Sequence, residues 1–262
     1  MVHVLGIDIG SAFSKAVVCA DGVIKGYAVA PSGGNYRETA ERIRAEALGK
    51  IGLTPGDLSF TVATGYGSAA VEFSNQTVTD ISCQAKGIHH LFPNVRTVID
   101  IGGQFSKVIK VDEDGRATNF ILNEKCAAGS GKFLQVIARL LHMEISDIGP
   151  LSLKSQKPVE FNTGCAVFAE SEAVCRIAEG ALMEDILAGV HKAMASKIVN
   201  LVERTGPVGI CVVTGGGAKD IGLVKAIEPE LGIILLVPEE PQIIAAHGAA
   251  LLAAERASSP RT

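Results

Sequence analysis

Two cysteines have neighbours that could give their thiols a chemical role. Cys126 lies in a Gly-rich turn, Asn-Glu-Lys-Cys-Ala-Ala-Gly-Ser-Gly-Lys-Phe at residues 123–133, between an apolar strand-like run and a helical pattern. Cys165 follows a similar glycine turn and also precedes an apolar, helix-like run. A helix N-terminus presents unpaired N–H groups and the positive end of the helix dipole, which stabilise a thiolate or a thiolate-ligated iron–sulfur cluster. Free cysteines are most often small buried hydrophobic residues, however, and the residues alone leave both interpretations open.

The other four cysteines show no pattern of paired ligands. Cys19 and Cys211 lie inside strand patterns, and Cys83 and Cys175 lie in helix-like segments, so we predict that all four are core residues. The sequence contains no CxxC pair, which argues against a disulfide framework and against a zinc ribbon.

The composition is that of an ordinary globular protein. Of the 262 residues, 47% are hydrophobic and 20% are charged. The net charge of −4, the absence of Trp and the aromatic content of 5% argue against nucleic acid and anionic membranes as partners. No apolar run reaches membrane-spanning length, and the N-terminus lacks the basic region of a signal peptide. We therefore expect a cytoplasmic protein.

The chain contains an internal repeat. Residues 8–15 read Asp-Ile-Gly-Ser-Ala-Phe-Ser-Lys and residues 100–107 read Asp-Ile-Gly-Gly-Gln-Phe-Ser-Lys, so six of eight positions are identical at an offset of 92. Each copy follows a buried strand pattern and opens a strand hairpin. We therefore predict two similar halves, divided as residues 1–93 and residues 94–262.

Periodicity and end signals predict the remaining elements. Helices are expected at residues 37–50, 80–91, 132–141, 164–179, 183–204 and 242–255, with one more after residue 220, and strands at residues 22–30, 58–63, 210–213 and 233–237. Residues 144–163 are interrupted by Gly149-Pro150 and Pro158 and are expected to be less regular.

The repeated loops contain the residue types that a phosphate and a magnesium ion require. Asp8 and Asp100 each end a strand, and the glycine two positions later lets backbone N–H groups approach a phosphate closely. A carboxylate in this place can hold Mg²⁺, directly or through water. A Thr-Gly-Gly-Gly turn at residues 214–217 would then receive the rest of a nucleotide. Because Asp-x-Gly alone is also typical of ordinary hairpin turns, the prediction depends on the repeat together with the triple glycine.

These motifs resemble those of the nucleotide-binding superfamily of actin, sugar kinases and the 70-kDa heat-shock chaperones. The loop at residues 8–11 matches its first phosphate loop, the loop at residues 100–104 its second, and the turn at residues 214–217 its adenosine motif. Nearly the whole chain is similar to one family in it, the ATP-dependent activators of 2-hydroxyacyl-CoA dehydratases and benzoyl-CoA reductases. The matching motifs are Thr64-Gly-Tyr-Gly67, Glu124-Lys-Cys-Ala-Ala-Gly-Ser-Gly131, Cys165-x-Val-Phe-Ala-Glu-Ser-Glu172 and Gly248-Ala-Ala-Leu251.

The resemblance implies a fold and a set of cofactors. The expected fold is α/β, with two similar ribonuclease H-like, actin-like ATPase domains, mixed sheets flanked by helices, and a nucleotide in the cleft between the domains. Cys126 and Cys165 would ligate one [4Fe–4S] cluster per homodimer, and ATP or ADP would bind with Mg²⁺. Ferredoxin or flavodoxin would donate electrons, and another iron–sulfur protein would accept them. Ligand counting agrees, because such a cluster takes four thiolates and a twofold dimer supplies them from two cysteines per chain.

The resemblance also assigns roles to individual residues. Asp8 and Asp100 are expected in the magnesium–phosphate region, and Gln104 is expected to orient the attacking water. The predicted nucleotide contacts are Ser11, Ala12, Phe13, Ser14, Lys15, Gly102, Gly103, Gln104, Glu144, Gly216, Gly217 and Gln242. Glu144 could equally be a solvated charge at a helix end, and we interpret Lys107 as an exposed strand lysine.

One position departs from the family pattern and leaves the acceptor open. The family usually reads Asp-Ile-Gly-Gly-Gln-Asp in the second loop, and here Phe105 replaces the last aspartate. Phe105 either packs between strands or marks a branch whose acceptor is a double-cubane-cluster reductase. Two other functions also stay open, an acetate or sugar kinase-like phosphotransferase and a non-enzymatic ATP-binding regulator. The first of these needs a second substrate pocket and a carboxylate base, for which the chain is short.

Overall fold

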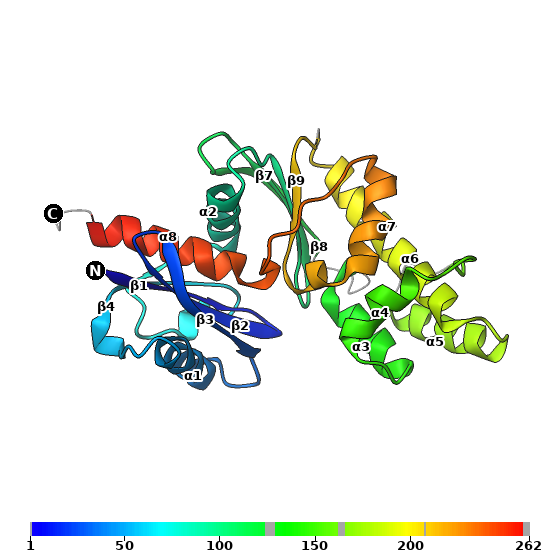
Figure 1. Ribbon diagram of the computed structural model, residues 1–262, viewed down its shortest axis with the longest axis horizontal. Coiled ribbons are helices and arrows are strands. Elements are labelled where there is room, and N and C mark those ends of the chain that lie inside the picture. Colours follow the sequence, from blue (N-terminus) through cyan, green and yellow to red (C-terminus); the bar gives the residue numbers. More distant parts are fainter. Residues whose placement is uncertain (1, 124–128, 162–165, 207, 259–262) are drawn as a thin grey trace. The chain divides into compact units, whose positions relative to one another are not determined.

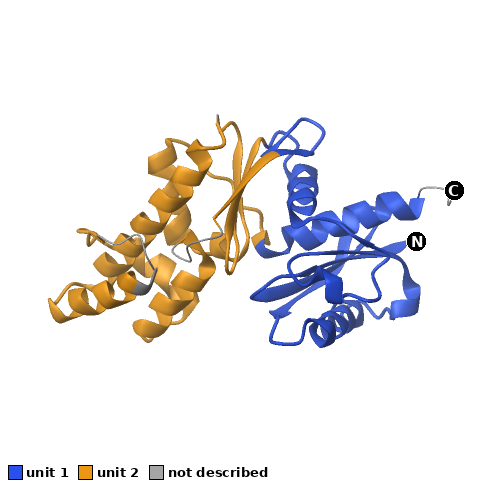
Figure 2. Cartoon of the chain, turned by 180° about the vertical axis from the view of Figure 1, so that it is seen from behind, with its two compact units in different colours: residues 1–95, 110–118, 242–262 blue, residues 96–109, 119–241 orange. Residues whose placement is uncertain are grey.

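The computed structural model describes residues 2–123, 129–161, 166–206 and 208–258. The chain forms two compact units, coloured separately in Figure 2. Unit 1 comprises residues 1–95, 110–118 and 242–262, and unit 2 comprises residues 96–109 and 119–241. The C-terminal helix thus belongs with the N-terminal residues, whereas the sequence-based division places it in residues 94–262. A domain boundary near residue 93 stays a prediction.

Unit 1 is built on a five-stranded mixed sheet in the order β3-β2-β1-β4-β5 (Figure 1). Its strands are β1 (His3–Ile9), β2 (Phe13–Ala20), β3 (Val23–Pro31), β4 (Leu58–Thr64) and β5 (Gln76–Thr77). β1 pairs antiparallel with β2 and parallel with β4, and Asp8 lies opposite both Lys15 and Thr64. The first half of the sequence repeat therefore occupies the centre of this sheet.

Helices cover both faces of the first sheet. They are α1 (Tyr36–Gly49), α2 (Asp80–Leu91) and α8 (Ile244–Ser258), with short 3₁₀ turns η1 (Pro55–Asp57), η2 (Ser68–Ala70) and η5 (Pro241–Ile243). Because side chains alternate along a strand, β1 sends Leu5 and Ile7 to the core shared with Ile43 of α1. Val4 points to the opposite face and joins the core that contains Cys83 of α2 and the alanines of α8.

Unit 2 is built on a four-stranded sheet in the order β8-β7-β6-β9. The strands are β6 (Thr97–Ile101), β7 (Ser106–Val111), β8 (Ala117–Asn123) and β9 (Cys211–Thr214). β6 pairs parallel with β9, and this register places Asp100 opposite Thr214. The equivalent pair in unit 1 is Asp8 and Thr64, so the two halves share one arrangement of strands around the repeated aspartate.

The helices of unit 2 share one large core with its sheet. They are α3 (Gly131–Leu140), α4 (Ile145–Ser152), α5 (Ala166–Ala178), α6 (Met183–Glu203) and α7 (Ile221–Leu231), with η4 (Gly216–Lys219) before α7. Ile99 and Ile101 of β6 pack in this core together with Phe133 of α3, Leu187 of α6 and Ile227 of α7. The core therefore links the strand that carries Asp100 to three of the helices.

The predicted fold class, α/β with two mixed sheets flanked by helices, is confirmed. Most predicted helices end within a few residues of the observed ones, and two segments differ. Residues 145–152 form α4 in spite of Pro150, because Ile148 is fully buried and a proline so near the helix end removes a single helical hydrogen bond. Residues 233–237 are not a strand: they make one parallel bridge between Leu236 and Val212, since Pro238 follows at once.

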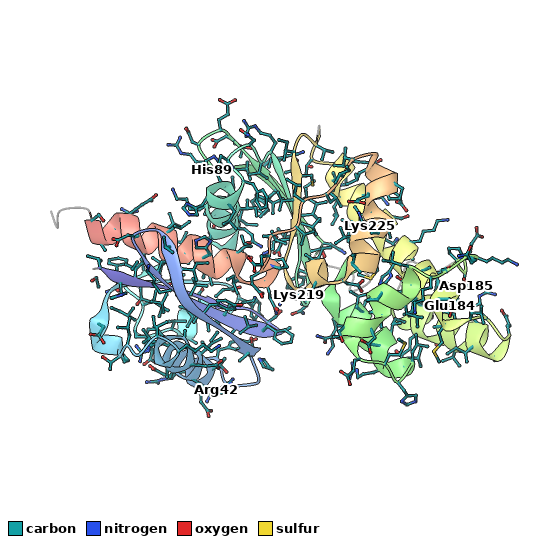
Figure 3. All side chains as sticks on the ribbon, viewed as in Figure 1. Arg42, His89, Glu184, Asp185, Lys219 and Lys225 are labelled. Carbon is teal, nitrogen blue, oxygen red and sulfur yellow. The ribbon has the colours of Figure 1, made fainter. Side chains whose placement is uncertain are left out.

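The segment after α4 is irregular, as the sequence predicts for its proline-containing part. It is held by Asp185 near the start of α6 (Figure 3), whose carboxylate accepts from the Ser155 hydroxyl at 2.6 Å and from the backbone N–H of Lys157 at 3.1 Å. These hydrogen bonds, chiefly that of Ser155, lower the pKa of Asp185.

Of the four cysteines that were predicted to be core residues, three are buried and one is exposed. Cys19, Cys83 and Cys211 are buried, and burial raises the pKa of the Cys19 and Cys83 thiols to about 12. Cys175 is exposed on α5, so the prediction was wrong for this residue. The buried side of α5 contains Ala173, and a position two residues later lies about 200° around the helix from it.

Candidate functional site

The first repeated loop holds its aspartate in a buried ion pair. Asp8 is the second-to-last residue of β1, and its Oδ2 lies 2.8 Å from Nζ of Lys15 on the adjacent strand. The two side chains are only 9% and 14% exposed. Each of these poorly hydrated groups compensates the charge of the other, and the contact fixes the carboxylate near the end of the strand.

The second repeated loop reproduces this ion pair. Asp100 Oδ2 lies 2.9 Å from Nζ of Lys107, and the side chains are 8% and 11% exposed. The interpretation of Lys107 as an exposed strand lysine was therefore wrong. Its position corresponds to that of Lys15 in the repeat, and the buried carboxylate of Asp100 draws the ammonium group inward.

A glycine from the neighbouring parallel strand closes each site on the other side. Gly65 has φ of +89°, and a Cβ there would lie 2.2 Å from Oδ1 of Asp8. Gly215 has φ of +81°, and a Cβ there would lie 2.5 Å from Oδ1 of Asp100. Each position thus requires glycine twice, for its left-handed backbone and for the approach of the carboxylate.

Sequence reasoning missed that these two glycines are equivalent. Residues 64–67 read Thr-Gly-Tyr-Gly and residues 214–217 read Thr-Gly-Gly-Gly, each directly after a strand that pairs parallel with the aspartate strand. The shared Thr-Gly-x-Gly pattern was the available signal. The internal repeat therefore includes this turn as well as the aspartate hairpin.

The serine of each loop is bonded inside its unit. Ser14 is fully buried, and its hydroxyl lies 2.8 Å from that of Ser32, which donates to the carbonyl of Gly10 at 2.6 Å. Ser106 occupies the same place in the second loop and donates to the carbonyl of Gly129. A contact between Ser14 and a phosphate stays a prediction, and the described hydroxyl already has a partner.

The tips of the loops are the accessible parts. Ser11, Ala12, Phe13, Lys15, Gly102 and Gly103 are partly exposed, and Gln104 is exposed. Gly102 N donates to the carbonyl of Phe105 at 2.9 Å, which closes the second hairpin. Phe105 itself is partly exposed, so its side chain is not a fully buried packing residue between strands.

The N-terminus of α3 corrects one expectation. The amides of Gly131 and Lys132 donate to the carbonyls of Gly102 at 2.9 Å and of Gly103 at 2.8 Å. These two amides are therefore not available to an anion, although the glycine turn in the sequence had suggested that they would be. Together with the bond from Ser106 to the carbonyl of Gly129, they make three hydrogen bonds between the second loop and the start of α3.

The two predicted cluster ligands lie outside the described residues. The structure does describe the helices next to them. α3 begins at Gly131, five residues after Cys126, and α5 begins at Ala166, directly after Cys165. The expected order of cysteine followed by helix is thus present at both places.

The remaining predicted contacts lie on helix starts and turns. Glu144 is exposed at the N-cap of α4 and makes no side-chain cap bond there. Gly216 is exposed and Gly217 is buried in η4, which follows the turn against Asp100. Gln242 is partly exposed in η5, and the carbonyl of the preceding Pro241 accepts from Gly215 N at 2.8 Å.

The described residues contain no ready-made metal centre. Across residues 2–123, 129–161, 166–206 and 208–258, no three His, Cys, Asp or Glu side chains gather closely enough to hold a metal ion. A magnesium ion at Asp8 or Asp100 would therefore take further oxygen ligands from a phosphate and from water. In the same part of the chain, no helix is both long and apolar enough to cross a lipid bilayer.

Comparison with known proteins gives matches over the full length of the chain. The (R)-2-hydroxyglutaryl-CoA dehydratase activating ATPase of Acidaminococcus fermentans is 40% identical over 260 residues, which cover 98% of this chain and 99% of that protein. The crystal structure of component A of that dehydratase has a TM-score of 0.95, with 40% identity and coverage of 99% and 100% of the two chains.

A second solved structure is of the activator of 2-hydroxyisocaproyl-CoA dehydratase from Clostridium difficile with bound ADPNP. Its TM-score is 0.93 at 38% identity, and the match covers 97% of this chain and 95% of that one. The family profile described as the BadF/BadG/BcrA/BcrD ATPase family matches residues 5–253. With the twin aspartate loops and these matches together, the chain belongs to the BadF/BadG/BcrA/BcrD ATPase family.

Proposed function

We propose that this ATPase works as a homodimer that hydrolyses ATP to drive an electron onto a partner iron–sulfur protein. The partner would be of the 2-hydroxyacyl-CoA dehydratase type or of the double-cubane-cluster reductase type. The observation that carries the proposal is the full-length similarity to the activating ATPase of A. fermentans, with a TM-score of 0.95 for the corresponding structure.

Both aspartate loops would act on the nucleotide. Ion pairs with Lys15 and Lys107 fix the carboxylates of Asp8 and Asp100, so that each could hold Mg²⁺ directly or through water against a phosphate. Gln104 is exposed at the tip of the second loop, where it could orient the attacking water. The ADPNP in the C. difficile structure supports an adenine nucleotide as the ligand.

Cys126 and Cys165 would hold a [4Fe–4S] cluster together with the same two cysteines of a second chain. The donor chemistry fits, because thiolates are the usual ligands of this cluster, and α3 begins five residues after Cys126 and α5 directly after Cys165. A bound cluster would supply one-electron transfer between a ferredoxin or a flavodoxin and the partner protein.

The described hydrogen bonds offer a route by which the nucleotide could influence the start of α3. The carbonyls of Gly102 and Gly103 in the second loop bind the first amides of α3, and Ser106 binds the carbonyl of Gly129. A displacement of this loop by a phosphate would therefore change the position of the residues that follow Cys126. For this to alter the partner's affinity, the two nucleotide states must differ in how they present that surface.

Anaerobic reconstitution with iron and sulfide tests the cluster. We expect about four iron atoms per two chains, lost in Cys126→Ser and in Cys165→Ser. Cys175→Ser is the matched control, because Cys175 is an exposed cysteine on α5 and is not a predicted ligand. A full iron content in Cys126→Ser would refute the cluster assignment.

Steady-state ATP turnover separates the proposal from the rival functions. We expect ATP hydrolysis by the protein alone, without any small-molecule phosphate acceptor. Turnover that appears only after acetate or a sugar is added would instead identify a phosphotransferase. ATP binding with no turnover under either condition would identify a regulator.

A further inference from the structure

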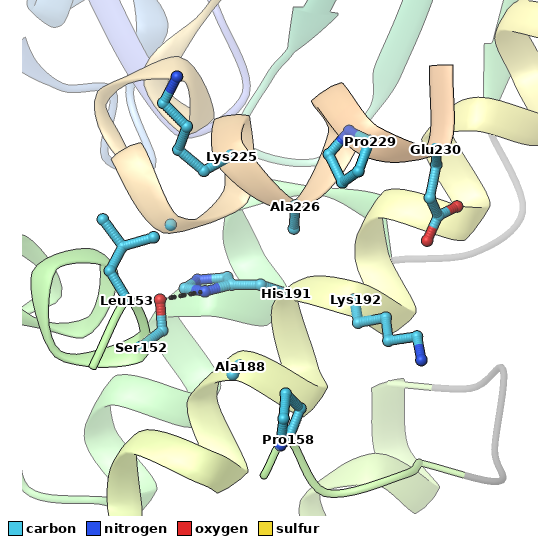
Figure 4. Close-up of a pocket in the computed structure, with 11 residues that line it drawn as sticks. Ser152, Leu153, Pro158, Ala188, His191, Lys192, Lys225, Ala226, Pro229 and Glu230 are labelled. Atoms are coloured by element: carbon cyan, nitrogen blue, oxygen red, sulfur yellow. Dashed lines mark hydrogen bonds between the residues drawn. The ribbon is translucent and has the colours of Figure 1, made fainter. Parts of the chain in front are cut away.

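A buried serine, histidine and aspartate, none of them a predicted nucleotide contact, meet in unit 2. Nδ1 of His191 on α6 lies 2.9 Å from Oγ of Ser152 at the end of α4, and Nε2 lies 2.9 Å from Oδ2 of Asp220 at the start of α7. His191 is 1% exposed. Figure 4 shows the contact between Ser152 and His191 beside a cavity.

These three residue types resemble a hydrolytic triad, but the surroundings of the serine do not. Ser152 Oγ has the carbonyl of Gly149 as an acceptor at 2.8 Å besides its contact with the imidazole. A nucleophilic serine gives its proton to the histidine and faces a substrate, whereas Ser152 is only 5% exposed. We therefore interpret the three residues as a structural contact.

Both ring nitrogens of His191 have a hydrogen-bond partner. Nδ1 faces Oγ of Ser152, which also has the carbonyl of Gly149 as an acceptor at 2.8 Å. Nε2 faces the carboxylate of Asp220, whose other oxygen accepts from the backbone N–H of Leu223 at 3.1 Å. His191 therefore connects the end of α4 to the start of α7.

Other charged groups near the ring lie on the wall of the adjoining cavity, as Figure 4 shows. They are Lys192 on α6 and Lys225 and Glu230 on α7. Lys225 is itself paired with Glu228 at 2.8 Å. Among the described residues, Asp220 is the carboxylate that contacts the imidazole of His191.

This histidine–aspartate pair is bonded directly to the glycine turn that precedes α7. The backbone N–H of Asp220 donates to the carbonyl of Gly217 at 3.2 Å. A Cβ at Gly222 would lie 2.2 Å from Oγ of Ser152, and one at Gly149 would lie 2.4 Å from Oδ1 of Asp220. Neighbouring backbone thus approaches the pair closely at Gly222 and Gly149, and a displaced Asp220 should displace the turn.

We propose that His191 is a positioning residue for the adenosine part of the nucleotide. It holds Asp220, and through Asp220 the turn with Gly216 and Gly217, while its bond to Ser152 holds the far end of the helix that starts at Glu144. The inference rests on the proposed function, because it presupposes that these residues bind ATP.

Binding of ATP and of inorganic tripolyphosphate to the full-length protein, measured by titration calorimetry, tests the proposal. The two ligands share the phosphates, and tripolyphosphate lacks the adenosine. His191→Ala should weaken ATP binding on the order of tenfold and leave tripolyphosphate binding unchanged, because the displaced turn would contact the adenosine and not the phosphates. Lys192→Ala, the neighbouring residue in the same cavity wall, is the control and should bind both ligands as the wild type does.

Added imidazole supplies a second readout. The adjoining cavity has a volume of about 420 Å³ and is lined by both His191 and Ser152, so it gives a small molecule access to the space vacated in His191→Ala. Imidazole should restore ATP binding to this variant and should not change that of the wild type. If His191 contributed only to general stability, imidazole would not selectively restore the binding of ATP over that of tripolyphosphate.

Asp220→Asn keeps the proposal testable where His191→Ala does not fold. Asparagine still caps α7, but it removes the carboxylate that faces Nε2 of His191, and we expect the same selective loss of ATP binding. Unchanged ATP affinity in either variant, or an equal loss of both ligands, would overturn the inference. A wild-type protein that binds no ATP would refute the proposed function itself.

Discussion

The two repeated loops have the same geometry around the aspartate but different connections to the rest of their units. Asp8 with Lys15 and Asp100 with Lys107 are equivalent ion pairs, each closed by the glycine of a Thr-Gly-x-Gly turn. In unit 1 the loop serine is bonded to Ser32, in the loop after β3. In unit 2 the loop is bonded to the segment that follows Cys126. The repeated loop is thus bonded to the loop after β3 in unit 1 and to the start of α3 in unit 2.

The buried histidines of the two units differ in a similar way. His191 in unit 2 has a hydrogen-bond partner for each ring nitrogen. His247 on α8 in unit 1 is 2% exposed, and neither ring nitrogen has a hydrogen-bond partner among the residues that the structure describes. Its ring contacts that of His90 at a centroid distance of 5.3 Å. One histidine is thus fixed by hydrogen bonds, whereas burial without such bonds disfavours the charged form of the other.

The largest predicted effects come from the two turn glycines. Gly65→Ala and Gly215→Ala each combine a left-handed backbone with a Cβ in contact with a carboxylate, and we expect a loss of at least about 4 kcal/mol in the free energy of unfolding. Chemical denaturation of both variants measures this loss in the free energy of unfolding.

Gly232→Ala is the matched control for the glycine substitutions. Gly232 has φ of +65° but nothing within 4 Å of a Cβ position, so only the backbone strain remains, at about 1 kcal/mol. Equal losses in Gly215→Ala and Gly232→Ala would show that the approach of Asp100 does not matter, and a large difference between Gly65→Ala and Gly215→Ala would break the equivalence of the two loops.

The ion pairs give the next largest effect. Lys107→Met leaves the carboxylate of Asp100 buried without its partner, and we expect a loss of about 3 kcal/mol in the free energy of unfolding. Lys15→Met should have the same effect in unit 1. The double variant Asp100→Asn/Lys107→Met removes both charges and should recover most of the stability, measured by a double-mutant cycle. Additive effects of the two substitutions would contradict a coupled pair.

Acid should destabilise the protein through His247. Burial, with a smaller contribution from His90, lowers the pKa of His247 from 6.5 to about 4 in the folded protein. The unfolded chain therefore binds more protons between these values, and the contribution of His247 is complete above about pH 6.5 and lost as the pH falls towards 4. The expected loss is on the order of 3 kcal/mol across this range.

Denaturation at several pH values with His247→Leu tests the assignment, because this part of the acid sensitivity should disappear. His142→Asn is the control, since His142 is exposed and its φ of +54° suits asparagine. An unchanged acid profile in His247→Leu would show that the acid sensitivity arises elsewhere.

The smallest predicted effect distinguishes the connections of the two loops. Ser106→Ala and Ser14→Ala should each cost about 1 kcal/mol of stability, the value of one hydrogen bond. Only Ser106→Ala should change the protease sensitivity or thiol accessibility around Cys126 when ATP is added, because only this serine is bonded next to that segment. Identical responses in both variants would contradict the difference between the loops.

The sequence predicted the parts of this fold that depend on local pattern. The repeat at residues 8–15 and 100–107 revealed two aspartate loops, and periodicity gave α2 and α6 almost to the residue. It did not reveal the ion pair of Lys107, since a lysine in a strand looks the same whether it faces water or a buried carboxylate.

The remaining misses share a cause. Asp220, Ser152 and His191 are far apart in the sequence, and their contact depends on how α4, α6 and α7 pack. The amides at the start of α3 looked available because the sequence does not show that the carbonyls of Gly102 and Gly103 approach them. Tertiary contacts decide these points, and a local pattern does not contain them.

The rate of ATP hydrolysis by two charge-neutral double variants tests the central claim, that both aspartate loops act on the same nucleotide. Asp8→Asn/Lys15→Met and Asp100→Asn/Lys107→Met remove the ion pair of one loop while keeping similar shape and, as expected above, most of the stability. We predict that each lowers the rate at least about hundredfold. A wild-type rate in either folded variant would contradict the account.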